Sequence, residues 1–94
     1  MKIFGMLRRM QTEEMWFLYI IRTENGRLYT GITNHLLRRF KSHQSGRGAR
    51  FFRISPPREV IYIEVLANKS EALKREIVVK KLSRQEKERL ARPG

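Results

Sequence analysis

Few residue types in this chain have side chains that could act in catalysis or bind a metal. All nine acidic residues are glutamates, the chain has no aspartate and no cysteine, and its two histidines are His35 and His43. The absence of cysteine excludes disulfides, zinc–thiolate sites, iron–sulfur clusters and thiol nucleophiles. Sites built on an aspartate pair or on several histidines are excluded as well. Any metal would be a hard cation bound through oxygen by very few protein ligands, which is typical of Mg²⁺ that keeps most of its water.

Positive charge dominates one continuous stretch of the chain. The 94 residues include 21 lysines and arginines against nine acids, which gives a formal net charge of +12. Between Asn25 and Arg58 there is no acid, and seven of the eight basic residues are arginines, whose planar guanidinium suits phosphate. This pattern predicts a nucleic-acid partner. Two alternatives stay open, a basic protein that is merely soluble and a protein that binds a membrane surface.

The chain length predicts one domain. No apolar run reaches the roughly 18 residues that a membrane span needs, and the N-terminal residues lack the apolar stretch of a secretory signal. All four methionines fall within the first 15 residues, and periodic segments begin only at Trp16. We therefore expect residues 1–14 to be a disordered N-terminal appendage and residues 15–94 to form the domain. The cysteine-free composition is compatible with a cytoplasmic location, which we predict.

Three strands are predicted from the β-branched and aromatic runs over residues 16–21, 28–33 and 59–65, with a turn at Glu24-Asn25-Gly26 between the first two. Helices are predicted from an N-cap at Asn34 to Gln44 or Ser45, from Asn68 or Ser70 to Leu82, and after the capping box that opens at Ser83. The order β-β-α-β-α-α predicts an α+β fold, in which a three-stranded antiparallel sheet is flanked by helices.

Two tyrosine-bearing tripeptides and a downstream arginine then give the chain a specific resemblance. Leu18-Tyr19-Ile20 lies in the first strand, Tyr29-Thr30-Gly31 lies in the second, and Arg39 follows Gly31 by eight residues. Their order and spacing, with the helices downstream, resemble the GIY-YIG nuclease superfamily, and most closely its small stand-alone bacterial members, the UPF0213 or YhbQ-like proteins. The resemblance covers about residues 16–91. It implies metal-dependent hydrolysis of DNA phosphodiesters, with a role in DNA repair or recombination.

The resemblance also assigns roles to individual residues. Tyr19 and Tyr29 match the two motif tyrosines, Arg39 matches the catalytic arginine, and His43 matches a histidine one turn later; these four are the predicted catalytic residues. Glu76 matches the metal-binding glutamate, and the implied cofactor is Mg²⁺ or Mn²⁺. The predicted nucleic-acid-binding residues are Arg22, Arg38, Lys41, Arg47, Arg50, Phe51, Phe52 and Arg53.

Helical geometry tests two of these roles independently. With about 100° per residue, Arg39 borders the apolar face of the first helix while Arg38 points to solvent. A catalytic arginine at the edge of the apolar face can be held in place by packing and still reach the surface. An ordinary arginine that extends its charged end from the helix edge to solvent would occupy the same position.

Glu76 falls within an arc formed by four apolar residues of the second helix, Ala72, Leu73, Ile77 and Val79. A carboxylate that faces the core is costly unless it is paired or bound to a metal. We favour the metal; the alternative is an ion pair with Lys80, four residues on.

The two tyrosines can share a site in only one of two hairpin registers. A two-residue Asn25-Gly26 turn would put Tyr19 and Tyr29 on opposite faces of the sheet. A three-residue loop that begins at Glu24 puts both on one face and pairs Tyr19 with Gly31, which leaves open space over the Tyr19 ring. We therefore predict a type I turn followed by a left-handed Gly26. The alternative is that both tyrosines are ordinary packing residues.

Together these residues predict a one-metal phosphodiesterase. Tyr19, alone or through Tyr29, would take a proton from water after the cation and Arg39 lower its pKa from about 10. His43 would orient the phosphate or relay a proton; otherwise it is a satisfied histidine on the helix surface. Single-stranded or branched DNA is the expected substrate. The alternative function is a module that binds DNA or RNA without cutting it, and a third is a subunit whose protein partner supplies the substrate specificity.

Overall fold

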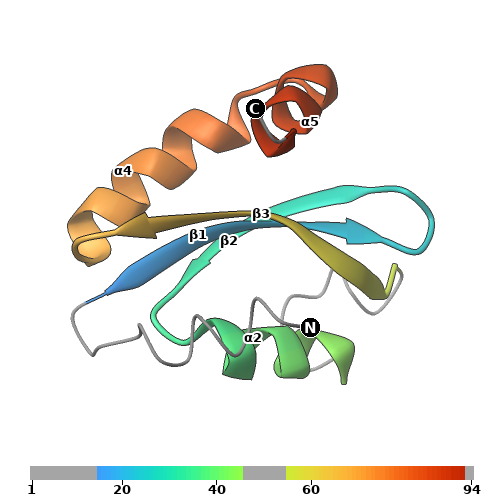
Figure 1. Cartoon of the computed structure of the whole chain (residues 1–94), viewed down its shortest axis with the longest axis horizontal. Helices are drawn as coiled ribbons and strands as arrows, with labels where there is room; N and C mark the ends of the chain where they lie inside the picture. The colour runs from blue at the N-terminus through green and yellow to red at the C-terminus, as the bar shows by residue number, and fades with distance from the viewer. Residues whose placement is uncertain (1–14, 46–54, 93–94) are drawn as a thin grey trace.

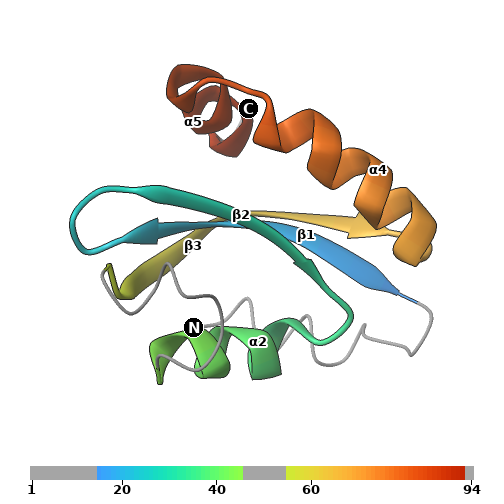
Figure 2. The same cartoon turned by 180° about the vertical axis from the view of Figure 1, so that it is seen from behind.

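The computed structural model describes residues 15–45 and 55–92. In chain order the elements are β1 (Trp16–Thr23), β2 (Leu28–Thr33), α2 (Leu36–Gln44), β3 (Pro57–Leu66), α4 (Lys69–Lys80) and α5 (Arg84–Ala91). The three strands form one antiparallel sheet in the order β2-β1-β3. Helices α4 and α5 cover one face of this sheet and α2 covers the other (Figure 1, and from behind in Figure 2). The predicted fold class and element order are confirmed.

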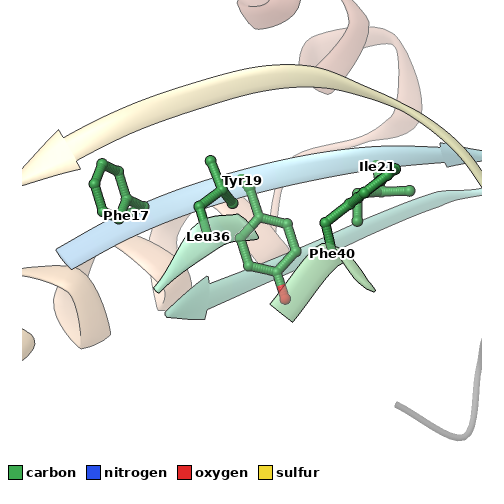
Figure 3. Close-up of a cluster of buried hydrophobic side chains, with 5 residues drawn as sticks. All are labelled: Phe17, Tyr19, Ile21, Leu36 and Phe40. Atoms are coloured by element: carbon green, nitrogen blue, oxygen red, sulfur yellow. The ribbon is translucent and has the colours of Figure 1, made fainter. Parts of the chain in front are cut away.

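The central strand β1 is apolar on both faces because helices lie on both sides of it. Its residues from Phe17 to Ile21 are all buried. Alternate side chains enter two clusters. Phe17, Tyr19 and Ile21 pack with Leu36 and Phe40 of α2 (Figure 3), whereas Leu18 and Ile20 pack with Val79 of α4. An uninterrupted apolar run is what a strand buried on both faces requires.

The β1–β2 hairpin has the predicted three-residue loop. The backbone N–H of Gly26 donates to the Thr23 carbonyl at 3.0 Å, and Gly26 has a φ of +84°, the left-handed conformation that glycine adopts without steric cost. In the resulting register Tyr19 lies opposite Gly31 and Ile21 lies opposite Tyr29. The predicted register is confirmed, and both tyrosines face α2.

Polar contacts hold this loop against the start of β3. The Asn25 Oδ1 atom accepts hydrogen bonds from the Thr23 hydroxyl, at 2.7 Å, and from the Ser55 hydroxyl. Thr23 and Ser55 are both buried, and the Glu24 N–H donates to the Pro56 carbonyl at 3.0 Å. The loop is therefore fixed from two sides, which stabilises the hairpin register.

Several predicted boundaries are wrong by one or two residues. The N-cap of α2 is His35, not Asn34, because the His35 Nδ1 atom accepts the Arg38 N–H at 3.3 Å. Strand β3 begins at Pro57 rather than Glu59, since proline is tolerated at the first residue of an outer strand. Helix α4 ends at Lys80, two residues early, and Ser83 then caps α5 with the predicted capping box.

The predicted apolar arc of α4 is confirmed at Ala72 and Val79 and wrong at Leu73 and Ile77. Leu73 and Ile77 are 43% and 57% exposed, and the fully buried positions of the helix are Ala72 and Val79. The helix lies close to the sheet through these smaller side chains, so its larger apolar residues point outward. Glu76 shares the inner face with Ala72 and Val79 because residues three and four apart lie on one side of a helix.

No helix within the described ranges is both long enough and apolar enough to cross a membrane. The predicted appendage, residues 1–14, lies outside those ranges.

Candidate active site

Three aromatic rings meet on the sheet face that α2 covers. The ring centroids of Tyr19 and Tyr29 are 6.2 Å apart, and the His43 ring lies 5.9 Å from the first and 5.5 Å from the second. The Tyr19 hydroxyl and His43 Nε2 are hydrogen-bonded at 2.9 Å. We call Tyr19, Tyr29 and His43 the three-ring cluster. Strands β1 and β2 and helix α2 each contribute one ring.

Gly31 makes room for this cluster. A Cβ atom at position 31 would lie 2.5 Å from the Tyr19 hydroxyl oxygen, 2.7 Å from Cζ of the same ring and 3.0 Å from a carbon of the Tyr29 ring. Any residue with a Cβ atom at position 31 would therefore displace the Tyr19 ring. Gly31 lies opposite Tyr19 as predicted, but the space that it leaves is filled by the Tyr19 ring and is not open.

The burial of Tyr19 controls its ionisation. Burial raises the pKa of the Tyr19 phenol well above its usual value near 10; the neighbouring Tyr29 and Glu76 also raise it, whereas Arg39 lowers it. We predicted that Arg39 would acidify the phenol. The direction is right, but burial outweighs it, so Tyr19 is protonated at neutral pH in this structure.

His43 is a buried residue, so the alternative of a helix-surface histidine is wrong. Its side chain is 1% exposed. Burial, and then the positive charge of Arg39, lower the pKa of His43 to about 4. The imidazole is therefore neutral near pH 7. When Nδ1 carries the ring proton, Nε2 can accept the hydrogen bond that the Tyr19 hydroxyl donates.

Arg39 and Arg38 have different surroundings, as their helical positions predicted. Both residues are exposed, but the charge of Arg39 acts on Tyr19 and on His43. No such effect of the Arg38 side chain is seen within the described residues; its backbone N–H donates to Nδ1 of the N-cap residue His35 at 3.3 Å. Arg39 thus lies at the rim of the three-ring cluster, where an arginine can reach both solvent and the site.

Glu76 brings a single carboxylate to this region. Its side chain is 19% exposed, its charge contributes to the raised pKa of Tyr19, and one of its oxygens lies 3.4 Å from the Lys80 Nζ atom. The ion pair that we considered as an alternative to a metal is therefore present. Within the described ranges, no three side chains of the types His, Cys, Asp or Glu gather as a metal site. A partly accessible carboxylate fits a hydrated Mg²⁺ with one protein ligand.

Arg22, one of the predicted nucleic-acid contacts, does not join the cluster. It alternates with Ile21 in β1, so its side chain lies on the face opposite the tyrosines, where it donates to a Glu59 oxygen at 3.0 Å. Lys41, like Arg38, is exposed on α2. The other predicted contacts lie outside the described residues: Arg47, Arg50, Phe51, Phe52 and Arg53.

The hydrogen bond between Tyr19 and His43 was not predicted from the sequence. One signal was available. His43 follows Leu36 by seven residues and Phe40 by three, so it lies on the buried side of the helix.

Comparison with known proteins agrees with this geometry. A family model described as the GIY-YIG catalytic domain matches residues 15–89. The chain belongs to the GIY-YIG family. This places it in a nuclease superfamily, as the tyrosine motifs implied.

UPF0213 proteins are among the relatives that this chain resembles. A UPF0213 protein of Pseudomonas aeruginosa (strain UCBPP-PA14) is 53% identical over 75 residues, covering 80% of this chain and 72% of the relative. The UPF0213 protein YhbQ of Escherichia coli (strain K12) is 43% identical over 79 residues, covering 84% of this chain and 79% of YhbQ. The solution NMR structure of the UPF0213 protein BH0048 from Bacillus halodurans is 38% identical, with a TM-score of 0.52 and 81% of each chain covered.

We predict that Gly31→Ala disrupts the three-ring cluster. The added methyl group overlaps the Tyr19 ring, and overpacking of this kind costs about 1–3 kcal/mol of unfolding free energy. Urea unfolding measures the loss, and the ¹⁵N shifts of the His43 ring report its bond to Tyr19. Thr30→Val, at the next position of β2, is the control, because Thr30 Oγ1 is buried with no hydrogen-bond partner among the described residues. Equal stability of the two variants would contradict the role of Gly31.

We predict that His43 makes the protein less stable in mild acid. Its pKa is about 4 in the folded state and near 6.5 in the unfolded chain, so the unfolded state binds the proton more readily. Its contribution is fully present above pH 6.5 and falls as the pH drops towards 4, by at most about 1.4 kcal/mol per pH unit.

Denaturant unfolding at a series of pH values between 4 and 6.5 measures how steeply the unfolding free energy changes with pH. His43→Gln should flatten this dependence, and His35→Gln, which removes the other histidine, should leave it unchanged. A slope that survives in His43→Gln would assign the pH dependence to other groups.

Proposed function

We propose that this GIY-YIG protein is a metal-dependent DNA endonuclease that hydrolyses phosphodiester bonds. One observation supports the proposal most strongly. The buried Tyr19 is hydrogen-bonded to the neutral imidazole of His43. The charges of Arg39 and of the Glu76 carboxylate both act on Tyr19. These groups can activate a water molecule, balance phosphate charge and bind a hard metal ion.

Tyr19 and His43 act as a pair in this proposal. The phenol can accept a proton from the attacking water only if its own proton leaves. His43 Nε2, 2.9 Å away, is the acceptor for that proton. The negative charge of a bound phosphodiester favours the imidazolium that results. Substrate binding therefore offsets the burial that keeps His43 neutral in the free protein.

Arg39 stabilises the charge that builds on the phosphate during attack. Its position at the rim leaves the guanidinium accessible to substrate, and preorganised donors of this kind act on the transition state more strongly than on the ground state. Arg38 and Lys41, exposed on α2, are suited to flanking backbone phosphates. Tyr29 packs against both of its ring neighbours and positions them.

Glu76 is the residue that would hold Mg²⁺ or Mn²⁺. A bound ion supplies Lewis-acid stabilisation of the phosphate oxygens and of the leaving oxygen. Lys80 Nζ lies 3.4 Å from one oxygen of this carboxylate, so its positive charge would compete with a bound cation. Three further points remain predictions from the sequence alone. They are a preference for single-stranded or branched DNA, a role in repair and a cytoplasmic location.

Cleavage of labelled single-stranded, flapped, nicked and duplex DNA in Mg²⁺ or Mn²⁺ tests the function. We expect cleavage of at least one substrate, and Arg39→Ala should lower kcat by about 10²–10³-fold, as the loss of a transition-state donor does. Arg38→Ala removes the same charge one position away, so it should raise KM and leave kcat nearly unchanged. If no substrate is cut in either metal, the endonuclease proposal is wrong, and a nucleic-acid-binding module is what remains.

Binding of Mn²⁺, measured by electron paramagnetic resonance, tests the metal site without activity. Glu76→Gln should weaken binding by at least about tenfold, within the range seen when groups that support a metal site are removed. Lys80→Gln should strengthen it, because the competing ammonium is lost. Glu71→Gln, in the first turn of the same helix, is the matched control and should bind like the wild type. Unchanged affinity in Glu76→Gln would rule out this carboxylate as the ligand.

A further inference from the structure

Helix α4 turns its smaller apolar residues towards the sheet. Ala72 and Val79 are fully buried, whereas Leu73 and Ile77 are 43% and 57% exposed. Burial of apolar surface stabilises a fold roughly in proportion to the area removed from water, so the larger side chains are the ones expected inside. The hydrophobic effect alone therefore does not explain how this helix is oriented.

A different rotation of α4 about its own axis would bury more apolar surface. Neighbouring residues of a helix point about 100° apart, and a rotation by that angle would bring Leu73 and Ile77 to the inner face. Ile77 would take the place of Glu76, and Lys80 would take the place of Val79. Lys80 is the last residue of the helix, where its long side chain could still reach solvent. The observed rotation thus keeps Glu76 inside and leaves two large apolar side chains outside.

Three polar side chains connect α4 to the outer strand β3. Tyr62 and Glu64 lie on the face of β3 that α4 covers. Their partners across the ladder are Ile20 and Leu18, which pack against α4. The Tyr62 hydroxyl donates to one carboxylate oxygen of Glu64 at 2.9 Å, and Arg75 Nε of α4 donates to the other at 2.8 Å. We call Tyr62, Glu64 and Arg75 the β3–α4 bridge.

The β3–α4 bridge is better formed than the neighbouring ion pair of the same helix. The side chains of Glu64 and Arg75 are only 25% and 34% exposed, and the Tyr62 ring packs against the apolar cluster beneath α4. Lys74 and Glu71 lie 3.9 Å apart, with side chains 74% and 54% exposed. Short, partly shielded hydrogen bonds between charged groups are stronger than exposed ion pairs. The bridge can therefore hold α4 against the sheet.

The β3–α4 bridge also fixes the direction of Glu76. Arg75 and Glu76 are consecutive, so their side chains lie on either side of the buried inner face of the helix. While Arg75 is held towards β3, Glu76 lies on the other side, where its charge acts on Tyr19. The alternative rotation would turn Arg75 away from Glu64 and break the bridge. The bridge thus opposes the rotation that apolar burial favours.

We propose that the β3–α4 bridge sets the rotation of α4 and thereby positions Glu76 beside the three-ring cluster. This inference rests on the proposed function for what Glu76 does there. The three residues of the bridge act through Glu76, so they are positioning residues. A packing that is less favourable than an available alternative is typical of residues that serve a function.

Cysteine labelling tests the rotation without a metal or a substrate. The chain has no cysteine, so Ile77→Cys and Val78→Cys each introduce one thiol at a position that is about half exposed. Each is combined with Arg75→Met, which removes the bridge, or with Lys74→Met, which removes the same charge from the adjacent residue. Circular dichroism verifies that the variants are folded.

Loss of the bridge should lower the ratio of the labelling rate at position 77 to that at position 78 severalfold. The rotated helix buries the first position and leaves the second in solvent. Unfolding exposes both thiols and so does not imitate this change. Lys74→Met should keep the wild-type ratio. If Arg75→Met keeps it too, the bridge does not set the rotation and the inference is overturned.

Binding of Mn²⁺ tests the positioning of Glu76. Arg75→Met and Glu64→Gln should each weaken binding by at least about tenfold, the effect of losing a group that holds a metal ligand in place. Charge alone predicts a different result, because removing the Arg75 cation would strengthen the binding of Mn²⁺. Lys74→Met should not weaken it.

Tighter or unchanged binding of Mn²⁺ in Arg75→Met would overturn the positioning of Glu76 by the bridge. A wild-type protein that binds no Mn²⁺ would contradict the metal site of the proposed function. The labelling ratio would then still decide whether the bridge sets the rotation of α4.

Discussion

The Tyr19 ring lies across the β1–β2 ladder on the bare backbone of Gly31, and the geometry of the candidate site depends on this contact. Side chains alternate between the faces of a strand, so a shift of one residue in the pairing would move Tyr29 to the far side of the sheet. The loop at Gly26, at the end of the hairpin, prevents that shift. A backbone conformation outside the site therefore determines whether the two phenols meet.

The site combines a buried neutral interior with a charged rim. Tyr19 and His43 are both held in uncharged forms by burial, while Arg39 and Glu76 come from helices on opposite faces of the sheet and act on Tyr19 with opposite signs. Neither Tyr19 nor His43 is therefore ionised in the free protein. The proton transfer that we propose becomes favourable only when a phosphate adds negative charge beside the imidazole, which couples water activation to the presence of substrate.

Much of the fold could be predicted from the sequence because its signals are local. The apolar run of β1, the three-residue hairpin loop and the Ser83 capping box each depend on adjacent residues, and all three are confirmed. The inner face of α4 was predicted only in part: Ala72 and Val79 are buried as expected, but tertiary packing left the larger Leu73 and Ile77 exposed. The helical position of His43 indicates its burial, but its hydrogen bond joins it to Tyr19, 24 residues away, and no local pattern contains that contact.

The outer strand β3 has a further consequence for how the protein behaves among its own copies. An outer strand offers unpaired backbone groups to any strand of a neighbouring molecule, and long, flat, apolar edges promote aggregation. Strand β3 begins with a proline, carries Arg58, Glu59 and Glu64, and has two register irregularities in its ladder with β1. Proline, charge and bulges each disfavour the addition of another strand. The ten-residue edge can thus remain exposed to other molecules without nucleating intermolecular sheets, which suits a chain whose strong positive charge already keeps its copies apart.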